Sequence, residues 1–364
     1  MKRNFNPTSI YLFIEMAAST FFPMIFVASS LYQVTVAGLT PLQLVLVGTT
    51  LEVSAFIFEV PTGVVADIYS RRLSIIIGYL LMGLGFLVEG FFPAFGPILL
   101  AQVIWGLGYT FTSGASEAWI SDEIGEEHAN KLFMRASRFG QYAALLGMGL
   151  AVLIGGTNTA VPIRAGGLGV FLIGVVLMLT MPETGFKPTP REDRDTWRQM
   201  VFTFKEGIQA VRARPRLKTI LWIGLFYGLY SEGFDRLWVK HIIDNFDLPA
   251  FFMGNQVAFF AALRAVGTIL TIIVMRSIEK RLDTSQPQVI GRAMLLVTGL
   301  LSAGLIGFVV SPLLGLTLGL FLLIMVVRKI AMPLYTSWVN QKLDSGTRAT
   351  VLSISSQVDA IGQI

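Results

Sequence analysis

The stretch Gly63-Val-Val-Ala-Asp-Ile-Tyr-Ser-Arg-Arg72 places one acid, Asp67, shortly before two bases, Arg71 and Arg72. It lies between two long apolar segments, and we predict a short charged loop there. Ion pairs in such a loop can hold two helix ends together in one conformation and release them in another. The stretch therefore predicts a polytopic membrane protein that changes conformation.

The composition indicates an all-α polytopic membrane protein. The 364 residues are 54% hydrophobic and 14% charged, and the mean hydropathy is +0.67, which excludes a soluble domain. A spanning helix needs about 20 mainly apolar residues, and runs of this length are too continuous for an outer-membrane barrel. We predict ten spans, with an eleventh that begins near Arg348 and is cut off at Ile364: 9–31, 41–62, 73–93, 97–120, 133–157, 161–181, 217–238, 250–275, 288–310 and 312–335.

The residue content excludes several kinds of chemistry. The chain has no cysteine and two histidines, His128 and His241, which fall at opposite ends of the predicted bundle. No metal site or other cofactor is therefore expected. The net charge of +5 follows the helix ends and forms no separate basic patch with interleaved aromatic residues, so no nucleic-acid partner is expected. An enzyme is not expected either, because the nearest candidate motif, Ser113-Gly114, has no base at membrane depth.

Basic residues predict the orientation. Most of the 28 Lys and Arg residues, with Arg328 and Lys329 among them, fall on the same side as the N-terminus, and such an excess marks the cytoplasmic side. We therefore predict a monomeric multi-pass protein of the plasma (inner) membrane, with a cytoplasmic N-terminus that is retained as the first helix.

Three parts are expected along the chain. Residues 1–181 form an N-terminal six-helix half, and residues 217–364 form a C-terminal half with helices 7–10 and the start of helix 11. Between them, 182–216 is predicted as a cytoplasmic linker. Its segment 197–211 repeats apolar residues at helical spacing, which is typical of an interfacial helix on the inner leaflet. A regulatory or partner-binding helix is the alternative.

Motifs spread over the whole chain give a more specific prediction. Besides the 63–72 stretch they are Phe58-Glu-Val-Pro-Thr62, Trp105-Gly-Leu-Gly108, Ala118-Trp-Ile-Ser-Asp-Glu123, Met181-Pro-Glu-Thr-Gly185 and Arg348-Ala-Thr-Val-Leu352. Together they resemble the major facilitator superfamily, in particular its drug:proton antiporter branch near the tetracycline- and macrolide-efflux-like members. The resemblance implies two six-helix halves, here truncated within helix 11, which rock around a midplane site.

The resemblance also implies a cytoplasmic gate. The matching positions are Asp67 in the loop, Asp122 at the inner end of helix 4 and Arg348 at the start of helix 11, with Gly63, Arg71 and Arg72 beside them. A purely topogenic role for the arginines is the alternative.

The chain departs from the family patterns at several points. Ser70 replaces a loop glycine, Ile68 replaces a usual basic residue, and Gln102 stands where many drug antiporters carry an arginine. In helix 5, no proline lies between Gly149 and Gly155.

Charged residues inside predicted spans are candidates for coupling, because a charge at the centre of a spanning helix costs about 2.5–3.5 kcal/mol. Burial disfavours the charged form of a carboxylate, which suits proton uptake and release by Glu15 and Glu52; the alternative is that they only tie helices together. Arg264 is predicted as the only deep basic residue, with Glu232 as its partner, in either a structural or a transport role. Asp235 and Arg236 are expected to pair elsewhere, and Glu89 is expected near the outer end within reach of solvent.

Aromatic residues in helices 4 and 7 are candidates for substrate contact, with core packing as the alternative: Trp105, Tyr109, Tyr227 and Tyr230. The function predicted from these features is proton-coupled efflux of an amphipathic small molecule or drug by alternating access. The expected partners are that substrate, protons and the lipid bilayer. An importer of a sugar, peptide or other metabolite, as a symporter or facilitator, is the alternative within transport, and a receptor that has lost transport is the alternative outside it.

Overall fold

The computed structural model describes residues 5–156, 158–188, 215–252, 254–281, 286–342, 358 and 361–364. The predicted linker helix at 197–211, Arg348 and the predicted start of an eleventh helix lie outside these residues. The described part is helical, with this order of elements: α1 (Pro7–Thr35), α2 (Pro41–Val64), the π-helical turn η1 (Val65–Tyr69), α3 (Arg71–Phe91), α4 (Phe95–Thr112), α5 (Ala115–Ile124), α6 (Glu126–Gly155), α7 (Ala160–Thr180), α9 (Pro215–Asn245), the 3-10 turn η3 (Ala250–Phe252), α10 (Gln256–Arg281), α11 (Pro287–Val310) and α12 (Leu314–Lys342).

The predicted all-α fold class is confirmed, and each of the ten predicted spans corresponds to a helical segment. Within the described ranges, nine segments are long and apolar enough to cross a membrane. The remaining long helix, α9, is 31 residues long, and it carries Glu232, Asp235 and Arg236 along its length. α9 is therefore the most charged of the long helices in the C-terminal bundle, and its ionic residues need partners.

The 63–72 stretch is not the predicted loop. α2 continues into η1, and only Ser70 is extended before α3 begins at Arg71. The φ angle of Ser70 is −175°, which any residue adopts, and its side chain accepts the Leu73 N–H at 2.9 Å. Serine therefore replaces the family's glycine here without strain, and it caps α3.

The predicted fourth span is broken into two helices. α4 ends at Thr112, and α5 begins after Gly114, whose φ of +69° lies in the left-handed region that favours glycine. The break places Glu117 in the first turn of α5, where a negative charge interacts favourably with the helix dipole.

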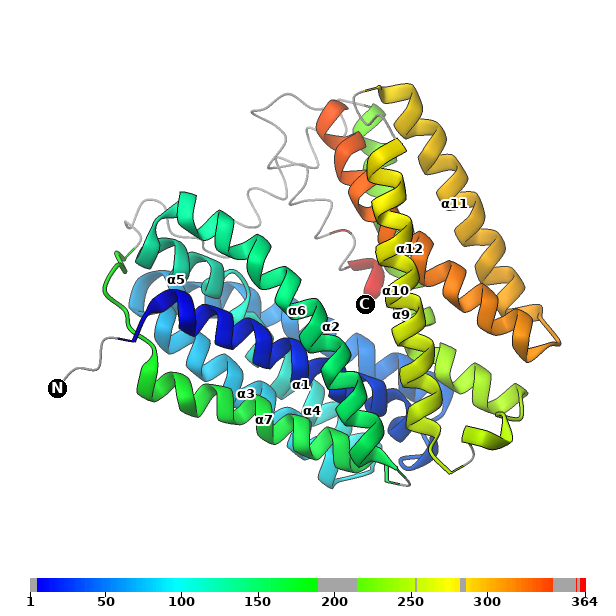
Figure 1. Ribbon diagram of the computed structural model, residues 1–364, viewed down its shortest axis with the longest axis horizontal. Coiled ribbons are helices and arrows are strands. Elements are labelled where there is room, and N and C mark those ends of the chain that lie inside the picture. The colour runs from blue at the N-terminus through cyan, green and yellow to red at the C-terminus, as the bar shows by residue number, and fades with distance from the viewer. Residues whose placement is uncertain are drawn as a thin grey trace.

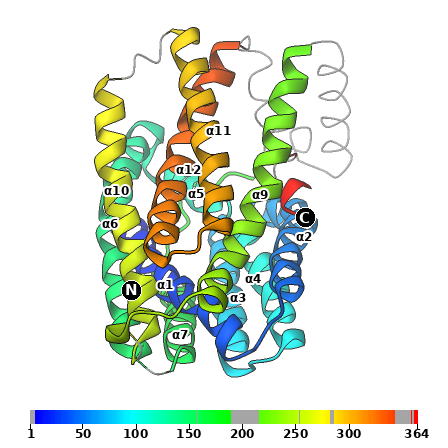
Figure 2. The same cartoon turned by 90° about the vertical axis from the view of Figure 1, so that its right-hand side faces the viewer.

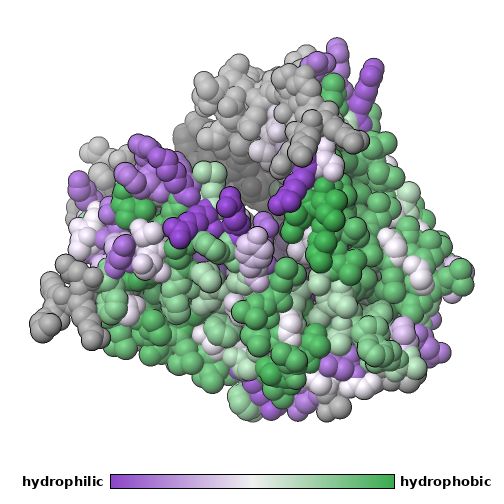
Figure 3. Space-filling model, in the orientation of Figure 1, coloured by the Kyte–Doolittle hydropathy of each residue, from purple (hydrophilic) through white to green (hydrophobic). Residues whose placement is uncertain are grey.

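The helices form two bundles, α1–α7 and α9–α12 (Figure 1). Their loops define two ends. We call the end with residues 63–72, 113–126 and 181–188 the linker end, and the end with residues 36–40, 92–94 and 246–252 the far end. The bundles diverge toward the linker end, and at the far end α9 lies beside α2 (Figures 1 and 2). Hydrophobic residues cover the flanks of both bundles, and hydrophilic residues gather toward the two ends (Figure 3), as expected of a protein within a bilayer.

Glycines permit the closest helix contacts. A Cβ at Gly108 would lie 2.7 Å from the Met82 nitrogen and 2.8 Å from the Gly78 carbonyl oxygen, so α3 and α4 meet backbone to backbone. We expect Gly108→Ala to force these helices apart and to destabilise the protein by about 1–3 kcal/mol. Thermal unfolding in detergent measures this change. Gly149→Ala is the matched control, because a Cβ there meets nothing within 4 Å. Equal midpoints for the two variants would contradict the prediction.

Candidate functional site

Three clusters of hydrogen bonds and ion pairs lie within or between the bundles, and the first is at the linker end. Arg71, at the start of α3, forms an ion pair with Asp122 of α5 at 2.5 Å. The side chains are 16% and 28% exposed, so the pair is only partly screened by water. Arg72 does not join this pair, because one of its guanidinium nitrogens donates to the Met178 carbonyl at 2.6 Å.

The segment after α7 is tied to this cluster. The Glu183 carboxylate accepts the Ser70 hydroxyl at 2.7 Å and the Arg72 N–H at 2.9 Å. The Glu123 carboxylate accepts the Thr184 N–H, the Thr184 hydroxyl and the Gly185 N–H, at 2.5, 2.7 and 2.8 Å. Glu183 lies in the Met181–Gly185 motif and Glu123 in the Ala118–Glu123 motif, but neither acid was predicted to have a role. Their role could have been predicted, because acids near helix ends can accept hydrogen bonds from backbone N–H groups that have no partner within the helix.

The other predicted gate residues occupy the same end. Asp67 lies in η1 and is half-buried. Gly63 lies in the last turn of α2, where an added Cβ would meet nothing within 4 Å. The described part of the predicted gate thus belongs to the N-terminal bundle, and a partner from the other bundle at Arg348 is outside the described residues.

A half-buried carboxylate on α1 and an exposed one on α5 lie near each other in the N-terminal bundle. Glu15 on α1 is half-buried, and its charge interacts with that of Glu117 on α5. Both acids also interact electrostatically with the side chains of Tyr11 and Tyr79. Repulsion between two neighbouring carboxylates is relieved when one of them binds a proton. Glu52 on α2, the other predicted coupling residue, is also half-buried.

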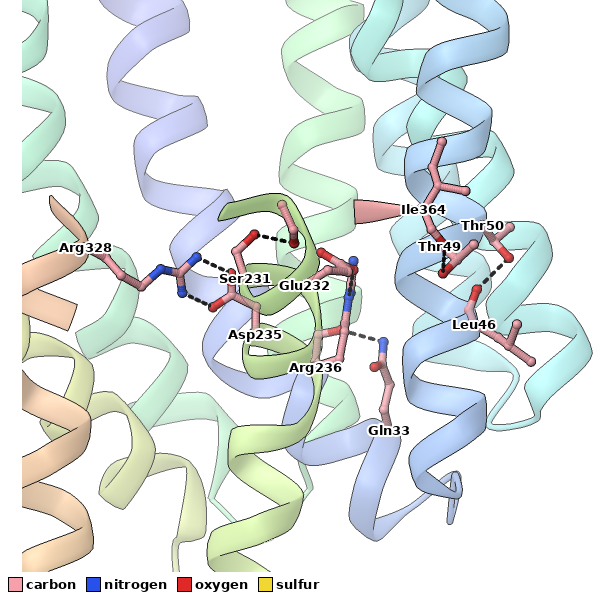
Figure 4. A network of polar contacts seen from close by, with 12 residues as sticks. Gln33, Leu46, Thr49, Thr50, Ser231, Glu232, Asp235, Arg236, Arg328 and Ile364 are labelled. Carbon is pink, nitrogen blue, oxygen red and sulfur yellow. Dashed lines mark hydrogen bonds and ion pairs between the residues drawn. The ribbon is translucent and has the colours of Figure 1, made fainter. Parts of the chain in front are cut away.

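The second cluster is an ionic network on α9 (Figure 4). Glu232 and Arg236 pair within the helix at 2.6 Å, and the Asp235 carboxylate accepts two bonds from Arg328 of α12, at 2.6 and 2.9 Å. The expectation that Asp235 and Arg236 pair with other residues is confirmed. Arg328 was assigned to the inner surface by its charge, and that was wrong: it lies midway along α12, where Asp235 offsets the cost of burying its charge.

The predicted ion pair between Arg264 and Glu232 is wrong. Glu232 is engaged by Arg236, four residues away on the same helix face. Arg264 lies instead over the ring of Trp238, with its guanidinium carbon 5.3 Å from the ring centre, which is a cation–π contact. Arg264 is also not the only deep basic residue, since Arg236 and Arg328 lie within the described spans.

The aromatic candidates fall into two environments. Trp105 packs in a ring cluster of the N-terminal bundle, 5.8 Å from Phe26 and 5.4 Å from Phe86, while Tyr109 is exposed. Tyr227 and Tyr230 lie next to the α9 network: their ring centres are 5.1 Å apart, and Arg328 lies 5.7 Å from the Tyr230 ring centre. Only the two tyrosines therefore accompany charged groups.

The third cluster surrounds Glu89 and was not predicted. Glu89 is 1% exposed, not solvated as expected. Its carboxylate accepts hydrogen bonds from the Ser29 hydroxyl, from the Gln33 amide at 2.9 Å and from the Gln102 amide at 3.4 Å. We call these four residues the Glu89 cage. The sequence does place polar residues of α1, α3 and α4 near the same end of their helices. Because buried polar side chains almost always have hydrogen-bond partners, this pattern could have predicted the cage.

Comparisons with known proteins agree with this architecture. A family model described as "Major Facilitator Superfamily" matches residues 8–364. The "Uncharacterized MFS-type transporter YxaM" of Bacillus subtilis (strain 168) is 25% identical over 330 residues, which cover 89% of this chain and 78% of that protein.

Solved structures show the same fold at low sequence identity. The nucleoside transporter NupG has a TM-score of 0.76 at 12% identity, with 99% of this chain and 88% of that chain covered. A peptide transporter POT in complex with alafosfalin has a TM-score of 0.70 at 16% identity, with 98% and 86% covered.

Proposed function

Because this chain belongs to the Major Facilitator Superfamily and is a multi-pass membrane transporter, not an enzyme, we propose that it couples transport of a small molecule to protons. The proposed substrate is an amphipathic small molecule or drug, and the proposed direction is export. We further propose that the protein acts as a monomer in the plasma (inner) membrane, with the linker end in the cytoplasm, where basic residues concentrate.

The observation that supports proton coupling best is the carboxylate pair of Glu15 and Glu117. A half-buried acid near a second, exposed acid, in a protein whose two bundles diverge toward one end, is suited to bind a proton in one conformation and release it in another. The membrane potential adds driving force, since one charge that moves through 100 mV gains about 2.3 kcal/mol. Divergence of the two bundles toward the linker end supports alternating access by movement of one bundle against the other.

The test of this proposal is gradient-driven uptake by inverted membrane vesicles that contain the protein. With a proton gradient imposed, a panel of amphipathic dyes and antibiotics is offered to wild type, Glu15→Gln and Glu52→Gln. We expect uptake by wild type and a loss of at least about tenfold in Glu15→Gln, because a side chain that cannot release a proton removes the coupling step. Glu59→Gln is the matched control, since Glu59 is an exposed carboxylate on α2, and it should keep wild-type uptake.

Import of a polar metabolite is the second candidate function. It is favoured by the Asp235–Arg328 pair with Tyr227 and Tyr230 beside it, because fixed charges and hydroxyl groups suit a polar solute better than an amphipathic one. The solved structures with this fold include transporters of nucleosides and peptides. If inverted vesicles accumulate none of the amphipathic compounds while right-side-out vesicles take up a nucleoside, sugar or peptide, the export proposal is wrong and import replaces it.

A further inference from the structure

Glu89 is isolated from water in a cage of neutral groups. The hydroxyl of Ser29 and the amides of Gln33 and Gln102 all point at its carboxylate, and the Tyr32 hydroxyl donates to its backbone carbonyl at 2.9 Å. The described residues of the cage include no cation, so three neutral donors stabilise the ionised form only in part. A buried carboxylate of this kind needs a positive charge from elsewhere to remain ionised.

That charge comes from the other bundle. Arg236 on α9 interacts electrostatically with Glu89, and Gln33 of the cage points toward Arg236 (Figure 4). The Arg236–Glu232 pair is seated directly against the backbone of Gly48 on α2, where a Cβ would collide with both side chains. The pair is therefore part of the contact that holds the two bundles together toward the far end.

The polar, charged and titratable groups around Glu89 come from four neighbouring helices, and Arg236 is the one whose charge acts on Glu89. α1 contributes Tyr32, and α4 contributes only the uncharged Gln102. α7 contributes Arg164, which donates to the Gly90 carbonyl at 2.8 Å and stacks on the Phe91 ring. The guanidinium of Arg164 is therefore held by the two residues that follow Glu89. α9 contributes Arg236, which is paired with Glu232. Arg236 is thus the cation whose position depends on how the two bundles meet.

The cage can also hold the neutral acid. An amide group can turn by half a rotation and present its oxygen in place of its nitrogen, and a hydroxyl can accept as well as donate. Gln102, at 3.4 Å the longest contact, can therefore accept the O–H of a protonated Glu89. One carboxylate oxygen takes up the proton and gives it back, and no other group has to change its covalent state.

We infer that Glu89 is a proton-binding site whose charge sets the strength of the contact between the two bundles at the far end. When Glu89 is ionised, its attraction to Arg236 favours the closed far end seen here. When Glu89 binds a proton, that attraction is lost and the equilibrium shifts toward an open far end. This inference rests on the proposed transport cycle, to which it adds a second proton site and its effect.

The test measures the distance between the bundles at the far end by double electron–electron resonance between two spin labels. The chain has no cysteine, so spin labels can replace Phe92 and Phe251, which are exposed at the two sides of this end. The labelled protein is studied in lipid nanodiscs, without substrate, between about pH 5 and about pH 9. We expect the short-distance population of wild type to grow as the pH rises, with a change of about tenfold or more in the ratio of closed to open protein.

Three variants make the test specific. Glu89→Gln should give the longer distance at all pH values, because it imitates the protonated acid. The charge-neutral double variant Glu232→Gln with Arg236→Gln should lose the pH response even though Glu89 remains, and it decides the question if Glu89→Gln does not fold. Glu59→Gln should keep the wild-type response. A wild-type pH response in Glu89→Gln, or in the double variant, would overturn the inference.

The outcome is independent of the export assay. No substrate is needed for the distance measurement, so failure of the vesicle assay to find a transported compound leaves the expected pH response in place. Wild type could also show proton-driven uptake while Glu89→Gln keeps the pH-dependent distance change of wild type. That result would retain the proposed function and reject Glu89 as a second proton site.

Discussion

Asp235→Asn is expected to lower the free energy of unfolding by about 2–3 kcal/mol. The change leaves Arg328 charged midway along α12, and arginine cannot release its proton to reduce the cost. Breaking a fully buried pair costs about 3–5 kcal/mol. The Asp235 side chain is 50% exposed and that of Arg328 is 21% exposed, so we place the loss below that range.

The thermal unfolding midpoint of the purified protein in detergent measures this loss. Asp235→Asn combined with Arg328→Gln should recover at least half of it, because the double variant leaves no unpaired charge. Asp244→Asn is the matched control: it removes an aspartate of the same exposure from α9, and its partner Lys240 is as exposed as Arg328. The Lys240–Asp244 pair is an i,i+4 contact at the end of α9 and does not join two helices, so the expected loss is below about 0.5 kcal/mol. A double variant as unstable as the single one would show that the aspartate acts through something other than the Arg328 charge.

The helices were predictable because their signal is local. A run of about 20 apolar residues predicts a spanning helix without reference to any neighbour, and the capping residues are local as well: Thr40 and Gln43 form a capping box at the start of α2. The helix ends were less certain. α12 continues to Lys342, seven residues beyond the predicted end at 335, and this is how Arg328 was taken for a residue near the surface.

Partner choice among the charged residues could not be predicted, because it depends on how the helices are rotated against one another. Each step along an α-helix turns a side chain by about 100°, so the sequence alone does not say whether Asp235 faces α10 or α12. The pair of Glu232 and Arg236 is the exception, since residues four apart always share a face. Glu89 was predicted to reach solvent because it lies near the end of its span. It is buried instead, because polar residues of α1 and α4 face it and supply its hydrogen bonds.

Reversing the charge of Asp122 is expected to reduce transport by about tenfold or more. Asp122→Arg sets two arginines together at the linker end, and a bias of about 1.4 kcal/mol against one conformation changes its population tenfold. Exchanging the pair, with Arg71→Asp and Asp122→Arg together, should restore most of the rate. Glu127→Arg makes the same charge change at a side chain that is 81% exposed, and it should stay within about twofold of wild type.

The exchanged pair also separates two ways in which this cluster could gate. Arg71 and Asp122 belong to the same bundle, so their attraction alone cannot hold the bundles together. It fixes the end of α3 against α5, and with Glu183 and Glu123 it fixes the start of the linker on that bundle. If the exchange restores transport, the pair works by keeping this end rigid. If the exchanged protein stays as inactive as Asp122→Arg, Asp122 must meet a cation on the other bundle during the cycle, which is the role that the family pattern assigns to Arg348.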